Sequence, residues 1–133
     1  IVSRAGAGWA DTARCNPTDR VNVLQVHGTL DAVVSYNGGV VLAGQPPFPS
    51  AETTVATWAG KNGCTGAMRE PIGGDLDLVV DLPFSETQRE SFNGCPPGAA
   101  AELWRIRGGS HIPVFNRQWA SMIYTWLSAH PKP

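Results

Sequence analysis

The strongest constraint on the fold is the segment Val-Asn-Val-Leu-Gln-Val-His at residues 21–27. It is rich in β-branched and apolar side chains over the length of one strand. A strand that is buried on most of its surface needs neighbours on both sides and helices on both faces. The segment therefore predicts an α/β fold with a mostly parallel sheet.

Local signals place the remaining elements around this strand. Ser50 is a candidate N-cap for a helix over residues 51–61, with Glu52 in its first turn and Gly63 beyond its end. Asn116 is a candidate N-cap for a last helix, which carries an apolar stripe that includes Trp119 and Trp126. Further strands are expected at 76–82, 87–93 and 100–108, and loops at 1–19 and 35–49.

These elements make up about half of an alternating α/β pattern, so the first strand lacks some of the neighbours that it needs. We therefore expect the sheet of these 133 residues to be incomplete as a single chain.

Composition excludes several classes of partner. The net charge is −1, and the ten Lys and Arg residues are scattered rather than gathered in a basic stripe, so nucleic acid is not an expected partner. The longest apolar stretches are far too short to span a bilayer, so no membrane association is expected. The cysteines lack the close spacing of a metal site, and neither a metal nor another cofactor is expected.

The three cysteines, Cys15, Cys64 and Cys95, are an odd number. Cys64 and Cys95 each lie in turn-like sequence, Asn-Gly-Cys, where two loops could meet in a disulfide. Free buried thiols are the alternative. A disulfide would indicate an oxidising compartment and would leave Cys15 without a partner.

Two residues suggest a site at the ends of strands. Asp31 follows the first buried strand closely, and His111 follows Gly108 and Gly109 after the strand expected at 100–108. Ligands of open α/β sheets bind at the carboxyl ends of the strands. A carboxylate bonded to one imidazole nitrogen can orient that ring for proton transfer at the other. α/β-Hydrolases present their acid and base in this chain order, and the nucleophile precedes both.

The segments LQVHGTLDAVVSYNGG, WAGKNGC and GCPPGAAAELWRIRGGSHIP together resemble the C-terminal half of polyhydroxybutyrate-depolymerase-like esterases, relatives of feruloyl and acetylxylan esterases. The resemblance covers roughly residues 13 to 127. It implies that residues 1–133 are the C-terminal part of one α/β-hydrolase catalytic domain. The expected activity is carboxylic ester hydrolysis, on a polyester, a feruloylated or acetylated polysaccharide, or a small ester. Secretion or a periplasmic location is also implied.

By this resemblance Asp31 is the orienting acid, His111 is the general base, and Cys64 and Cys95 form a disulfide. Tyr36 and Ile112 are candidate residues on the substrate side, because the chain departs from the family pattern beside them. The family often has Pro where this chain has Ser35, and Thr-Trp-Pro where this chain has Ile112-Pro113. His27 is expected to be a structural histidine with backbone partners, and His130 to have no function.

The nucleophile is missing from the sequence. The motif G-x-S-x-G holds the serine of α/β-hydrolases on a sharp turn. Ser3 is the one serine before Asp31, and Ile1 and Ala5 stand where the glycines should be. Ser110 has Gly108 before it but Ile112 after it. The serine and the oxyanion donors are therefore expected in a preceding segment or a second chain, and this chain alone is expected to be inactive.

Two other interpretations stay open. The chain could be a non-catalytic module that binds carbohydrate or polymer, with Trp9, Trp58 or Tyr36 stacking on the ligand. It could also be a truncated product without activity. Core packing is the simpler interpretation for Trp58, Trp104, Trp119 and Trp126, because they fall at core-facing positions of the expected helices and strand.

Overall fold

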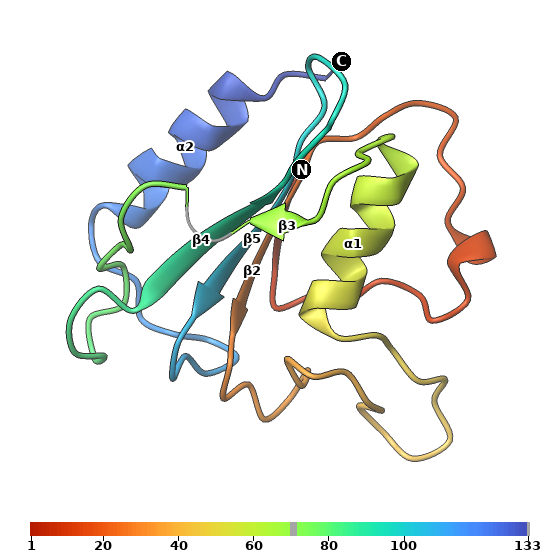
Figure 1. Cartoon of the computed structure of the whole chain (residues 1–133). Helices are drawn as coiled ribbons and strands as arrows, with labels where there is room; N and C mark the ends of the chain where they lie inside the picture. The colour runs from red at the N-terminus through yellow and green to blue at the C-terminus, as the bar shows by residue number, and fades with distance from the viewer. Residues whose placement is uncertain (70–71, 133) are drawn as a thin grey trace.

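A five-stranded mixed sheet lies between two helices (Figure 1). The computed structural model describes residues 1–69 and 72–132. The strand order is β1-β2-β5-β4-β3. The bounds are Val2–Arg4 (β1), Val23–Gly28 (β2), Met68–Arg69 (β3), Thr87–Phe92 (β4), Ala101–Ile106 (β5), Ala51–Lys61 (α1) and Trp119–Ala129 (α2). The α/β class expected from the sequence is confirmed. The sheet is mixed rather than mostly parallel as expected, because β4 pairs antiparallel with both β5 and β3.

The parallel part of the sheet is centred on β2 and β5. All six residues of β2 are buried, as its composition predicts. Strand β2 pairs in parallel with β1 on one side and with β5 on the other, and Gly28 is opposite Ile106. Both strands therefore end at the same edge of the sheet, the lower one in Figure 1.

Each helix covers one face of the sheet, and successive side chains of β5 point to opposite faces. Leu103 packs with Val55 and Ala59 of α1. Trp104 and Ile106 belong to the hydrophobic cluster on the opposite face, which α2 covers through Trp126. Trp104 and Trp126 are buried, whereas Trp58 and Trp119 are partly buried.

Helix α1 has the bounds that its sequence predicts. The Ser50 hydroxyl accepts a hydrogen bond from the Thr53 amide at 3.0 Å. This bond satisfies one of the amides that have no partner within the first turn. Gly63 adopts a positive φ of 78°, which suits the residue after a helix.

Helix α2 starts later than predicted. Asn116 is not its N-cap; that position is held by Gln118, whose side chain makes no capping bond. The Asn116 side chain instead accepts a hydrogen bond from the Gln118 amide at 2.9 Å, in the turn that precedes the helix. A short polar side chain can cap a turn in the same way as a helix, so the two cases look alike in the sequence.

The segment 76–82 is not the strand that was predicted. Leu76 and Val79 make only isolated bridges, to Thr87 and Phe115. The amides of Leu78 and Val79 donate to the buried carboxylate of Glu86, at 3.0 and 3.2 Å, where a strand would pair with another strand. The short strands β1 and β3 were not expected, because three and two residues are too few to show a pattern.

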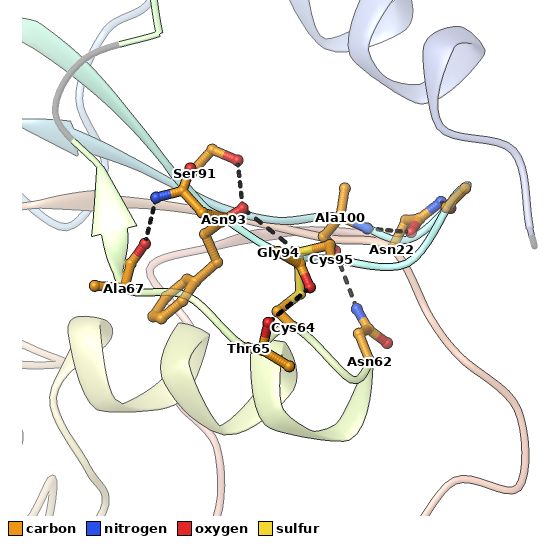
Figure 2. The surroundings of a disulfide bond; sticks show 12 residues. Asn22, Asn62, Cys64, Thr65, Ala67, Ser91, Asn93, Gly94, Cys95 and Ala100 are labelled. Atoms are coloured by element: carbon orange, nitrogen blue, oxygen red, sulfur yellow. Dashed lines mark hydrogen bonds between the residues drawn. A yellow bond between two sulfur atoms is a disulfide. The ribbon is translucent and has the colours of Figure 1, made fainter.

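A disulfide joins Cys64 to Cys95, as the family resemblance implied (Figure 2). It links the end of α1 to the connection between β4 and β5. The amides of Thr65 and Gly66 donate to the carbonyls of Gly94 and Asn93 at 3.1 and 3.0 Å beside it. Cys15 is a free cysteine. In the described part of the chain, neither helix has the length and apolar content needed to cross a bilayer.

Candidate active site

The turns that follow β2 and β5 are bonded to each other. The Thr29 amide donates to the Ile106 carbonyl at 2.9 Å, and the Leu30 amide donates to the Gly109 carbonyl at 3.0 Å. The Gly108 amide donates to the Thr29 hydroxyl at 2.9 Å. The two turns therefore form one unit at the edge of the sheet, with Asp31 in the first and His111 just after the second.

Gly28 and Gly109 allow the two turns to approach this closely. A Cβ at Gly28 would lie 2.2 Å from the Gly109 carbonyl oxygen and 2.7 Å from the Ser110 carbonyl oxygen. A Cβ at Gly109 would lie 2.6 Å from a methyl group of Ile106. These distances are too short for any side chain, so both positions require glycine for the observed packing.

The two bonded turns bring Asp31 and His111 together. Nδ1 of His111 lies 2.9 Å from Oδ2 of Asp31, within hydrogen-bond distance. The other carboxylate oxygen, Oδ1, accepts hydrogen bonds from the amides of Val33 and Val34, each at 2.8 Å. The Asp31 side chain is fully buried and the His111 ring is 31% exposed. A buried carboxylate thus faces a ring that solvent can reach.

The environment keeps Asp31 ionised. Burial alone would raise the pKa of Asp31, but hydrogen bonds from His111, Val33 and Val34 outweigh it and hold the pKa below its usual value. The carboxylate consequently selects the tautomer of His111 with its proton on Nδ1. This leaves Nε2 of His111 as an acceptor, and Nε2 has no hydrogen-bond partner among residues 1–69 and 72–132.

His27 is a third member of this cluster that the sequence interpretation did not place there. Its Nε2 lies 2.8 Å from the Val34 carbonyl oxygen, which confirms the expected backbone partner. The same atom lies 3.2 Å from Oδ2 of Asp31. The signal in the sequence was the short stretch His-Gly-Thr-Leu-Asp, in which a turn folds Asp31 back toward the end of its own strand.

The two candidate substrate-side residues lie in different surroundings. Ile112 is 67% exposed and follows His111 directly. Tyr36 is buried, and its hydroxyl donates to Glu52 at 3.1 Å and accepts from Nε of Arg105 at 2.7 Å. Its ring packs edge-on against His27, with the ring centroids 5.6 Å apart. Contact with a substrate stays a prediction for both residues, and the burial of Tyr36 gives it no support.

A hollow of about 240 Å³ lies elsewhere on the molecule. It is lined by residues of β1, β2, the segment 7–15 and α1, including Trp9, Gln25 and Trp58, rather than by Asp31 or His111. The His, Cys, Asp and Glu side chains that the structure describes form no group of three that could hold a metal ion. His130 lies apart from the site, beside Trp126 and Glu102.

Comparison with known proteins shows a similarity to an esterase. No protein-family profile matches the chain. Over 104 residues the chain is 33% identical to feruloyl esterase B of Piromyces equi. The chain is similar to part of an esterase. The match covers 76% of this chain but only 17% of that esterase, so the chain corresponds to a small share of the relative's length.

Proposed function

We propose that this chain supplies the acid and the base of a carboxylic ester hydrolase with a Ser-His-Asp mechanism. The observation that carries the proposal is the 2.9 Å distance between Nδ1 of His111 and Oδ2 of Asp31. The similarity to a feruloyl esterase supports the same class of reaction. We further propose that residues 1–133 are the C-terminal part of one α/β-hydrolase domain, secreted or periplasmic, which the disulfide suits.

In the proposed reaction, His111 moves protons through Nε2. Nε2 takes the proton of a serine hydroxyl as the serine oxygen attacks the ester carbonyl, and then gives it to the leaving alkoxide. A water molecule, deprotonated by the same nitrogen, then attacks the acyl-enzyme carbonyl. The nitrogen returns that proton to the serine oxygen as the acyl–serine bond breaks and the acid is released. Asp31 holds the ring in place and stabilises the imidazolium that forms at each step.

The serine lies outside these residues in this proposal, because no serine of the sequence stands in a G-x-S-x-G motif. Strand β1 is an edge of the sheet, and it is parallel to β2. A preceding segment or a second chain could add a strand beside β1. That strand would finish, like β2 and β5, at the end of the sheet where Asp31 lies. The oxyanion donors would come with it.

The substrate class proposed is an ester of a feruloylated or acetylated polysaccharide, a hydroxyalkanoate polyester, or a small ester. The name of the relative favours feruloyl esters within this range. Exposed apolar side chains next to the two site residues, Leu30 and Ile112, suit a substrate with apolar groups.

Ester hydrolysis by the whole polypeptide that carries this chain tests the proposal. His111→Ala and Asp31→Asn should each lower kcat by about a thousandfold or more. His130→Gln is the matched control, because the His130 ring stacks on Trp126 and faces Glu102 rather than Asp31 or His111. If His111→Ala and Asp31→Asn hydrolyse esters as fast as His130→Gln and the wild type, the proposal is wrong. Carbohydrate or polymer binding without hydrolysis would favour the non-catalytic module.

A further inference from the structure

Two imidazole rings face one carboxylate oxygen in this site. Oδ2 of Asp31 lies 2.9 Å from Nδ1 of His111 and 3.2 Å from Nε2 of His27. The His27 side chain is 1% exposed and that of Asp31 is fully buried. A buried carboxylate shared by two rings raises the question of which ring carries the additional proton during a reaction.

Gln25 decides the protonation of His27. Its Nε2 donates a hydrogen bond to the Gly6 carbonyl at 2.7 Å. A carbonyl oxygen only accepts, so the atom of Gln25 that faces it must be the nitrogen. The same nitrogen lies 3.1 Å from Nδ1 of His27. That ring nitrogen must therefore accept, and the proton of His27 must lie on Nε2.

The Nε2–H group of His27 influences both oxygens of the Asp31 carboxylate, Oδ1 through Val34 and Oδ2 directly. It donates to the Val34 carbonyl at 2.8 Å and so fixes the turn whose Val34 amide donates to Oδ1 of Asp31. It also places the positive end of its N–H dipole 3.2 Å from Oδ2. A second proton on His27 would set an N–H group against the NH₂ of Gln25, so the network leaves His111 as the ring that gains charge.

We infer that His27 is a positioning residue for the Asp31–His111 pair, and that Gln25 sets its tautomer. The inference rests on the proposed function of Asp31 and His111. His27 touches no reacting atom; it acts through Asp31, by fixing the carboxylate and by remaining neutral while His111 takes up and releases a proton.

Nuclear magnetic resonance tests the inference without any need for activity. Single variants of the three histidines in residues 1–133 assign their ring nitrogens in long-range ¹H–¹⁵N spectra of the whole polypeptide. We expect His27 to carry its proton on Nε2 and His111 on Nδ1. Finding the proton of His27 on Nδ1 would overturn the inference. The tautomer is read in the wild-type protein, and the variants serve only to assign the signals.

A pair of variants separates positioning from packing. His27→Gln keeps an NH₂ group that can donate to the Val34 carbonyl, whereas His27→Leu fills similar space and donates nothing. We expect His27→Leu to weaken the Nδ1–H signal of His111 and to lower kcat by about ten- to a hundredfold, with KM little changed. His27→Gln should restore both. Equal loss in both variants, or no loss in either, would overturn the inference.

The proposed function can fail separately. If His111→Ala leaves ester hydrolysis unchanged, the esterase proposal fails, and the tautomer of His27 still stands as a structural finding. If His111→Ala abolishes hydrolysis but His27→Leu matches the wild type, the esterase proposal stands and the role of His27 fails.

Discussion

At the scale of single residues, Asp31 is held by more donors than a solvated turn aspartate would have. Oδ1 accepts from two backbone amides and Oδ2 lies within bonding distance of His111. Hydrogen bonds of this kind to a charged group each contribute about 1.5–3 kcal/mol. Asp31 should therefore contribute to folding as well as to the proposed chemistry.

The lowered pKa of Asp31 predicts how stability depends on pH. Because the pKa is lower in the folded than in the unfolded protein, the ionised group stabilises the fold above the unfolded pKa of about 3.9. This contribution is lost as the pH falls through the folded pKa. We expect Asp31→Asn to lower the free energy of unfolding by about 2 kcal/mol at pH 7, with the difference shrinking below about pH 4.

Urea unfolding of wild type and Asp31→Asn between pH 3 and pH 7 measures this difference. The difference between the two proteins is the useful quantity, because burial raises the pKa of Glu102 and gives the wild-type curve a contribution of opposite sign. A difference that is constant with pH would contradict the account of Asp31.

At the scale of elements, the site depends on the close contact between the ends of β2 and β5. A methyl group at Gly28 would meet backbone atoms of Gly109 and Ser110, which cannot move aside as a side chain can. We expect Gly28→Ala to lower the free energy of unfolding by about 1–3 kcal/mol and to weaken the His111 Nδ1–H signal.

Gly60→Ala is the matched control for this change. Gly60 lies within α1 and has nothing within 4 Å of the position of an added Cβ. Alanine is favoured over glycine in a helix by up to about 1 kcal/mol, so this variant should be as stable as the wild type or more so. Equal stability of the two alanine variants would show that the strand ends do not need the contact.

The disulfide supports the connection into β5 from the other end of that strand. It closes a loop with a sequence separation of 31 residues. Loop-closure entropy for that length corresponds to about 3–4 kcal/mol of stability. We expect the double variant Cys64→Ser/Cys95→Ser to lose about this amount in urea unfolding, with reduction of the wild type giving a similar loss. A change under 1 kcal/mol, on the order of one ordinary hydrogen bond, would contradict this expectation.

Elements with strong local signals could be predicted from the sequence, and those set by distant contacts could not. The cap at Ser50 and the apolar composition of β2 and β5 act within a few residues, and the structure has these elements where they were expected. Segment 76–82 has the composition of a strand, but the Glu86 carboxylate takes up two of its amides. That contact depends on a fold that composition alone does not specify.

The same distinction holds for the site. Asp31 and His111 could be proposed together because each follows a strand and the order suits the fold. His27 could not be connected to Asp31, because their contact depends on how the turn after Gly28 folds back. In the sequence Gln25 is simply a polar residue within a buried strand. Only the position of the Gly6 carbonyl shows that the nitrogen of its amide faces His27.

At the scale of the whole molecule, the central claim is that His111 and Asp31 activate a serine that lies outside residues 1–133. Fluorophosphonate labelling of the whole polypeptide, with the labelled residue located by mass spectrometry, tests it most directly. We predict one labelled serine outside these residues, with labelling lost in His111→Ala and retained in His130→Gln. Labelling that persists in His111→Ala, or esters that are cleaved by a protein that never labels, would contradict the account.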